Sequence, residues 1–237
     1  MSSRQEEKER RRQERLAREQ AEARAAGRRK RLQLAFGGLL ALVLVAGLAA
    51  VAVGVIGGKD DSGSNGDSGS TPSSTAKIPA QQVSDIKEAA DAAGCKLTNP
   101  AFEGQNHAEK DFKASDYKTN PPTSGDHTPD WYEDGIYAPG DTPSLGKTVH
   151  PLEHGRIEVQ YKPGTPQKTV DQLESLLGEN DDGYHMLLFE NTTGMDAQVA
   201  ATAWTHSLTC AEMNDKVFDA IRTFRARYID KGPEQVP

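Results

Sequence analysis

The stretch RIEVQYKPGTPQKTVDQLESLL, residues 156–177, decides the fold class of this chain. Its first part, residues 156–161, alternates apolar and polar side chains, as a half-buried strand does. Residues 162–166 supply turn signals, and residues 169–177 are typical of a helix. A strand, a turn and a helix in close succession predict a domain that contains both element types.

The flanking sequence extends this pattern in both directions. MLLFE at 186–190 and QVAATAWTHSL at 198–208 each predict a strand, and Asn214 is expected to cap a final amphipathic helix. Upstream, residues 81–93 carry apolar side chains at helical spacing. The order of elements predicts an α+β fold, a small α/β sandwich in which helices cover one face of an antiparallel or mixed sheet.

An apolar run without any charged residue, LAFGGLLALVLVAGLAAVAVGVIGG, occupies residues 34–58. A helix rises about 1.5 Å per residue, so this run is long enough to cross a hydrocarbon core of about 30 Å. The competing interpretation is a cleavable signal peptide, whose apolar part usually has only about 7 to 15 residues. We therefore predict a single transmembrane helix over residues 32–58.

The charges on the two sides of this helix predict its orientation. Residues 1–31 hold twelve of the 28 Lys and Arg but six of the 35 Asp and Glu, so the rest of the chain carries a net charge of −13. Lys and Arg are retained on the cytoplasmic side, so residues 1–31 are expected to form a basic, helix-forming cytoplasmic tail of a cell-membrane protein. The Ser/Gly/Asp-rich residues 59–79 predict a disordered linker, and residues 80–237 an extracytoplasmic domain. Its acidic character argues against nucleic acid as a partner.

Both cysteines of the chain, Cys95 and Cys210, fall in the part that is expected to be extracytoplasmic. An oxidising compartment favours a disulfide between them, which would close a long loop and stabilise the fold. The alternative is a pair of free thiols that serve as soft ligands for copper.

The motif VHPLEHG at 149–155 places His150, Glu153 and His154 within five positions. It matches H-x-x-E-H, a zinc-peptidase signature that works on a helix. Pro151 and Gly155 argue against a continuing helix, so we expect a turn here and set the peptidase interpretation aside.

A second candidate ligand, His127, ends the segment NPPTSGDH at 120–127, inside a long irregular region over residues 96–148. Prolines and a glycine in this segment predict a rigid turn that fixes the direction of His127. Neutral imidazoles and a carboxylate suit Zn²⁺ or Cu²⁺. The predicted metal ligands are His127, His150, Glu153 and His154. The predicted loop scaffold comprises Asn120, Pro121, Pro122, Gly125 and Gly155.

Two other interpretations of these residues stay open. The histidines and Glu153 can instead hydrogen-bond the backbone and brace the loop, or carry acid–base chemistry on an unknown substrate. Softer groups elsewhere would favour copper if they came near, but none of them has ligand spacing. These groups are His185, Met186, His206 and Met213.

The sequence resembles a known family at these residues. NPPTSGDH at 120–127, VHPLEHG at 149–155 and ATAW at 201–204, together with Trp131, Gly135 and Tyr137, are similar to the bacterial membrane-anchored family catalogued as domain of unknown function 3105. The resemblance implies a membrane-tethered extracytoplasmic domain, but no activity, substrate or catalytic residue. The family pattern more often has Pro where this chain has Asp126, which alters the loop or adds a carboxylate ligand. The site that the resemblance carries over comprises Asn120, Pro121, Pro122, Thr123, Ser124, Gly125, His127, His150, Leu152, Glu153, His154 and Gly155.

Three functions fit these observations, and the sequence leans against an enzyme. The first is an anchored extracytoplasmic protein that binds copper or zinc. The second is a non-enzymatic cell-envelope interaction module, in which Tyr117, Trp131, Tyr132 and Tyr137 supply the contact surface for a protein partner. The third is a metal-assisted hydrolase, which would need an open coordination position and has no nucleophile motif such as G-x-S-x-G to favour it.

Overall fold

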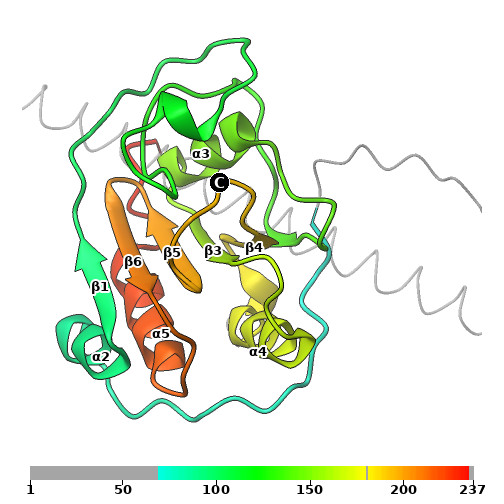
Figure 1. Ribbon diagram of the computed structural model, residues 1–237, viewed down its shortest axis with the longest axis vertical. Coiled ribbons are helices and arrows are strands. Elements are labelled where there is room, and N and C mark those ends of the chain that lie inside the picture. The colour runs from blue at the N-terminus through cyan, green and yellow to red at the C-terminus, as the bar shows by residue number, and fades with distance from the viewer. Residues whose placement is uncertain (1–68, 180, 235–237) are drawn as a thin grey trace, which may run out of the picture. The chain divides into compact units, whose positions relative to one another are not determined.

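A six-stranded sheet organises the residues that the computed structural model describes, 69–179 and 181–234 (Figure 1). The strands run in the order β1-β6-β5-β3-β4-β2, with parallel pairing of β3 and β2 to β4 and antiparallel pairing elsewhere. The sheet is therefore mixed, and the predicted α+β class is confirmed. The strands are β1 (Cys95–Thr98), β2 (Gly135–Ile136), β3 (Ile157–Tyr161), β4 (Met186–Glu190), β5 (Val199–Ala203) and β6 (His206–Cys210).

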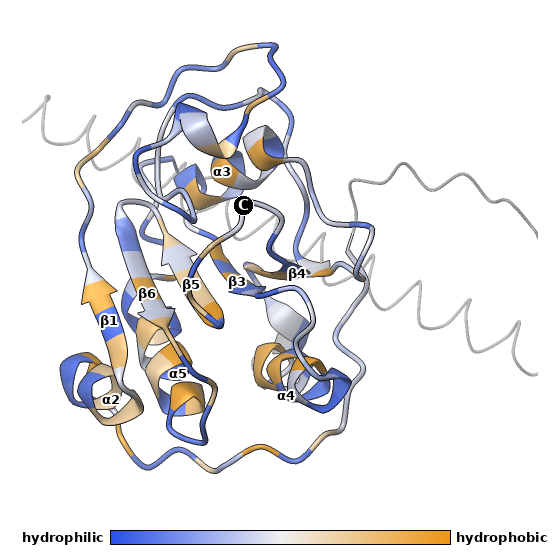
Figure 2. Cartoon of the chain, in the orientation of Figure 1, coloured by the Kyte–Doolittle hydropathy of each residue, from blue (hydrophilic) through white to orange (hydrophobic). Residues whose placement is uncertain are grey.

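Of the four α-helices among the described residues, three pack against one face of this sheet. Alternate residues of the strands, such as Val159, Leu188 and Ala201, point to this face and share one apolar core with the helices. Figure 2 shows apolar residues along α4 and α5, as expected of helices with one buried side. These three helices are α2 (Ile86–Ala93), α4 (Gln167–Leu177) and α5 (Val217–Tyr228). The fourth, α3 (Leu145–Glu153), lies apart from them in Figure 1.

The opposite face of the central strands is polar but buried. Glu158, Gln160 and Thr202 alternate with the core residues, and each is at most 3% exposed. Every residue of β3 is buried, so the prediction of a half-buried strand is wrong in this respect. The loop that leads to α3 contacts this part of the sheet, because Thr205, in the turn after β5, donates its N–H to the Thr123 carbonyl.

The segment predicted as one strand over residues 198–208 forms two strands instead. β5 and β6 make a hairpin, and the chain turns at Trp204 and Thr205. Thr205 adopts a positive φ of 59°, which reverses the chain within two residues. A strand pattern with continuous β propensity does not reveal such a turn, because neither residue is a usual turn former.

The predicted disulfide between Cys95 and Cys210 is present. The two residues lie directly opposite each other on β1 and β6, and the bond joins the edge strand to its neighbour. It removes both sulfurs from the set of available metal ligands, so the interpretation as two free copper-binding thiols is wrong.

The predicted tail, the transmembrane helix and residues 59–68 of the linker lie outside the described residues. Among the described residues, no helix is both long and apolar enough to cross a membrane. Residues 69–79, at the end of the predicted linker, contact the domain. Ser70 pairs with Ile136 of β2, the N–H groups of Ser73 and Ser74 donate to Glu174, and Ile78 packs against the core.

Candidate metal site

The motif at 149–155 lies at the C-terminal end of α3, where a turn was predicted. His150 and Glu153 belong to the last helical turn, and His154 follows as the C-cap. As predicted, the helix does not continue beyond the motif, but it is longer than the turn expected here and contains Pro151. A proline in this position leaves the carbonyl of Lys147 without its helical donor, and the N–H of Tyr132 donates to that carbonyl at 3.4 Å. The helix is therefore completed by a neighbouring loop.

Four candidate ligand atoms converge beside this helix end. One nitrogen each from His107, His127 and His150 and one carboxylate oxygen of Glu153 all lie within 4.8 Å of one another. Nε2 of His127 is 3.1 Å from Oε2 of Glu153, and Nε2 of His107 is 3.8 Å from the same oxygen. Two ligand atoms bound tetrahedrally to one Zn²⁺ are about 3.3 Å apart, given bonds of about 2.0 Å. The separation of 3.1 Å between His127 and Glu153 is close to that value.

Backbone hydrogen bonds fix the direction of two of these imidazoles. Nδ1 of His127 lies 2.8 Å from the Gly125 carbonyl, and Nδ1 of His150 lies 2.8 Å from the Thr128 carbonyl. A carbonyl oxygen only accepts, so each Nδ1 carries the proton and donates it. Each neutral ring then presents an unprotonated Nε2 to the cluster, which is the tautomer that a metal needs.

A second group of candidate ligands shares His150 with the first. Nε2 of His150 lies 3.1 Å from Nε2 of His154, which in turn lies 3.2 Å from Oε2 of Glu234. His154 is thus placed with Glu234 and not with the His127 group. Of the four predicted ligands, the structure brings His127, His150 and Glu153 together and sets His154 beside them.

The family model that matches this chain is described as a protein of unknown function, DUF3105, and covers residues 107–237, more than half of the chain. The chain belongs to this family. The matched region contains every member of both ligand groups. No curated protein and no solved structure matches the chain.

Burial controls the protonation of the DUF3105 histidines. It lowers the pKa of His127 and of His150, and it lowers the pKa of His154 to about 4, with the neighbouring His150 adding to the effect. It also raises the pKa of Glu153. The three imidazoles are therefore neutral at pH 7 and available as ligands.

The predicted scaffold residues shape the loop that carries His127. Gly125 has a φ of 133°, and a Cβ there would overlap the ring of Tyr117, so this close approach requires glycine. Asn120 donates through Nδ2 to the Thr193 carbonyl, and Pro121 and Pro122 are buried. Asp126 accepts two hydrogen bonds from Asn106, which join this loop to the segment before it, and Asp126 is in neither ligand group.

Gly155, the last predicted scaffold residue, lets the C-terminal segment approach the motif. It has a φ of 83°, and a Cβ there would contact the backbone of Asp230 and Gly232. The carbonyl of Gly155 accepts from the N–H of Asp230, and that of Glu153 accepts from the N–H of Glu234. The end of the domain is thereby held beside the candidate ligands.

Two ligand candidates were missed from the sequence. His107 is paired with His127 through backbone bonds between two irregular segments, and Glu234 comes from the C-terminal segment. Neither has a spacing relation to the motif that would single it out. The softer groups considered for copper lie elsewhere in the domain, since His185 contacts Asp230, His206 contacts Asn99 and Met186 is in the core.

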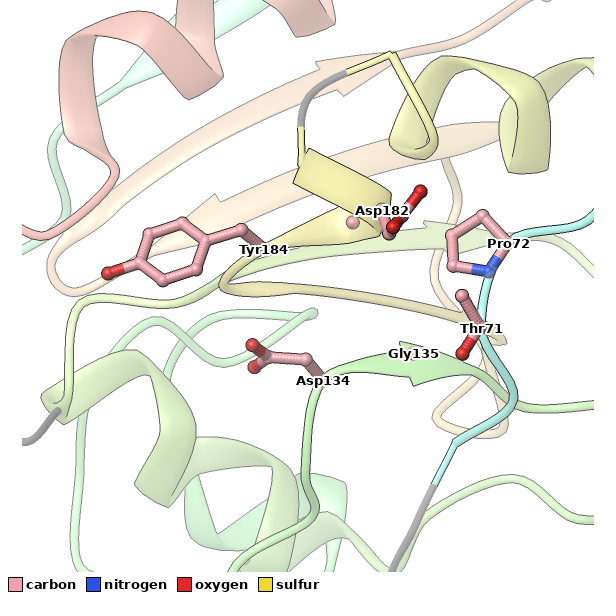
Figure 3. A pocket seen from close by; sticks show the side chains of 7 residues that line it. Thr71, Pro72, Asp134, Gly135, Asp182 and Tyr184 are labelled. Carbon is pink, nitrogen blue, oxygen red and sulfur yellow. The ribbon is translucent and has the colours of Figure 1, made fainter. Parts of the chain in front are cut away.

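A pocket of about 380 Å³ near β2 contains none of the candidate ligands (Figure 3). Asp134 lines it, but its carboxylate already accepts from Nε of Arg156 and from the N–H of His185. The His/Glu cluster is the more informative feature, because its polar groups face one another.

Proposed function

We propose that this protein is a membrane-anchored, extracytoplasmic metal-binding protein that holds one Zn²⁺ or Cu²⁺ ion. The ligands are His107, His127, His150 and Glu153. The apolar run at 34–58 and the charge difference across it support the anchoring and the orientation.

The contact between His127 and Glu153 carries this proposal. Nε2 of His127 is unprotonated, because Nδ1 donates to Gly125, and it is a buried atom with no hydrogen-bond partner. It nevertheless faces a carboxylate oxygen at 3.1 Å. Two electron-pair donors at this distance need a cation or a shared proton between them, because buried polar atoms are rarely left unpaired.

The chemistry of the ligands supports Zn²⁺ or Cu²⁺. Three imidazoles and one carboxylate form a nitrogen-rich set with no sulfur, which suits these two divalent ions better than Cu⁺ or Ca²⁺. Four protein ligands also make a closed site, of the kind that stores or carries a metal more often than it catalyses a reaction. The proposal therefore favours metal handling over hydrolysis.

The structure lends less support to the interaction module. Tyr117 and Tyr137 are buried, and their hydroxyls donate to the carbonyls of Asp126 and Glu133. The ring of Trp131 packs against His150 and His154 at 5.1 Å from each. Three of the four aromatic side chains proposed as a contact surface thus stabilise the loop and the cluster.

Metal content of the full chain tests the proposal. The protein is purified in detergent without a polyhistidine tag, incubated with Zn²⁺ or Cu²⁺, dialysed and measured by elemental mass spectrometry. We expect one ion per chain, and loss of that ion in His127→Ala and His150→Ala. His206→Ala is the matched control, since this histidine contacts Asn99 and Tyr228. A wild-type chain that stays metal-free with both ions overturns the proposal.

A further inference from the structure

The second ligand group, His150, His154 and Glu234, resembles an incomplete metal site. Its three ligand atoms lie within 4.8 Å of one another, as those of the first group do. The contacts of 3.1 Å and 3.2 Å again approach the separation of about 3.3 Å between ligands of one tetrahedral ion. It has three members instead of four, and its exposed member is Glu234, at 56%, whereas the exposed member of the first group is His107, at 45%.

The two groups cannot hold metal at the same time through His150. A neutral imidazole has one available lone pair, and in His150 this pair is on Nε2 because Nδ1 donates to the Thr128 carbonyl. An ion bound by His127 and Glu153 therefore competes with an ion bound by His154 and Glu234. His150 is the ligand that both positions require.

We propose that His150, His154 and Glu234 form a second position for the same ion, through which it enters and leaves the four-ligand position. His150 stays bound throughout, while His154 and Glu234 are exchanged for His107, His127 and Glu153. This inference rests on the proposed function. No electron is transferred, and each position supplies one carboxylate, so the ion moves without a change in the charge of its ligands.

The hydrogen bonds of the two positions support the second position as the one that the ion occupies briefly before it reaches the four-ligand position. His127 and His150 each have Nδ1 fixed by a carbonyl, whereas Nδ1 of His154 is buried without a hydrogen-bond partner. Such orienting bonds typically raise metal affinity by about 10- to 100-fold. The position with His154 has one imidazole fewer and one less orienting bond, as expected of a site that the ion occupies briefly.

The C-terminal segment places Glu234 where an arriving ion can reach it. Backbone bonds from Asp230 to Gly155 and from Glu234 to Glu153 hold this segment against the motif. Arg156, two residues beyond His154, is committed to Asp134 through Nε at 2.7 Å and does not occupy the Glu234 carboxylate. The exposed carboxylate and the buried imidazole thus link solvent to the cluster.

Exchange kinetics in the full chain in detergent test this inference, with Zn²⁺ as the probe. The rate of zinc transfer to a chromophoric chelator is measured for wild type, His154→Ala and Glu234→Gln, with Glu212→Gln as an exposed carboxylate control outside both ligand groups. We expect both variants to keep one ion per chain and to exchange it on the order of tenfold more slowly. The control should exchange at the wild-type rate.

A combined variant provides an equilibrium test. In His127→Ala, any residual zinc should be held by the second position, and adding Glu234→Gln should remove it. Unchanged exchange rates in both single variants, or two ions per wild-type chain at saturation, would overturn the inference while leaving the proposed function intact. A wild-type chain that binds no zinc or copper would overturn both.

Discussion

Nε2 of His127 faces Oε2 of Glu153 at 3.1 Å in a buried site, and Nδ1 of the same ring donates to Gly125. The relationship couples the loop at 120–127 to the end of α3. It also distinguishes a metal site from a structural hydrogen bond. A hydrogen bond requires a proton between the two atoms, whereas a metal site requires that both atoms be unprotonated.

The first prediction concerns Glu153→Gln. A glutamine amide can donate to Nε2 of His127, so the metal-free variant should be as stable as the wild type or more stable by about 1 kcal/mol. The same change removes the carboxylate ligand, and metal content should fall. Urea unfolding of the metal-free protein and elemental analysis measure the two effects. Glu109→Gln, an exposed carboxylate of the same loop region, is the control. Undiminished metal binding by Glu153→Gln would contradict the role of this residue as a ligand.

The second prediction concerns Glu158, which is 1% exposed on the polar face of β3. Gln160 donates to Oε2, and Oε1 has no hydrogen-bond partner. Burial raises the pKa of Glu158 well above the usual range for a glutamate. Between the ordinary pKa of a glutamate in the unfolded chain and the raised pKa of Glu158 in the folded chain, only the folded chain keeps this proton. The free energy of unfolding therefore falls as pH rises through this range. Glu158 lowers the free energy of unfolding by about 1.4 kcal/mol per pH unit until it ionises in the folded chain.

Glu158→Gln should remove this contribution, because the amide cannot ionise. The difference in free energy of unfolding between variant and wild type should grow in favour of the variant as pH rises, and Glu109→Gln should show no such trend. Urea titrations at several pH values between 5 and about 9 measure it. A difference that does not vary with pH would mean that Glu158 has an ordinary pKa.

Local patterns predicted the elements that pack against the apolar core, but not those that build the second face. α4 and α5 follow from the helical spacing of their apolar residues, and β4 follows from its apolar run, four of whose five residues are buried. The helix α3 does not, since it contains Gly146, Thr148 and Pro151 and depends on the loop that donates to Lys147. β2 has two residues and is defined by its pairing to β4 and to Ser70.

The candidate site was predictable only where its ligands are close in sequence. His150 and Glu153 are three residues apart, and the rigid segment at 120–127 indicated His127. His107 reaches the cluster through a single backbone bridge to His127, and Glu234 through bonds to the end of α3. Both depend on long-range backbone pairing that leaves no spacing signal, so only the folded structure reveals them.

The third prediction concerns the disulfide. Cys95→Ala combined with Cys210→Ala opens a loop whose ends are 115 residues apart in sequence, and the free energy of unfolding should fall by about 2–5 kcal/mol. Metal content should stay at one ion, because no candidate ligand lies on β1. Urea unfolding and elemental analysis of the folded variant check both statements. Loss of the metal from a variant that remains folded would show that the edge strand supports the site.

The fourth prediction concerns Gly232, whose Cα lies against the carbonyl of Glu153. A Cβ at this position would overlap that carbonyl oxygen and the backbone nitrogen of Gly155. Neither backbone atom can move easily, since both belong to the turn that ends α3. Gly232→Ala should therefore displace the C-terminal segment and separate Glu234 from His154.

The expected result for Gly232→Ala is faster hydrogen exchange at the amides of Asp230 and Glu234, which donate to Gly155 and Glu153. Zinc should still bind at one ion per chain but exchange as slowly as in Glu234→Gln, because the carboxylate no longer reaches His154. Gly178→Ala is the matched control, since the tightest contact of a Cβ there is a side-chain atom of Pro72 at 3.2 Å. Normal zinc exchange in a Gly232→Ala chain whose C-terminal amides have lost protection would show that the metal reaches His150 by another route.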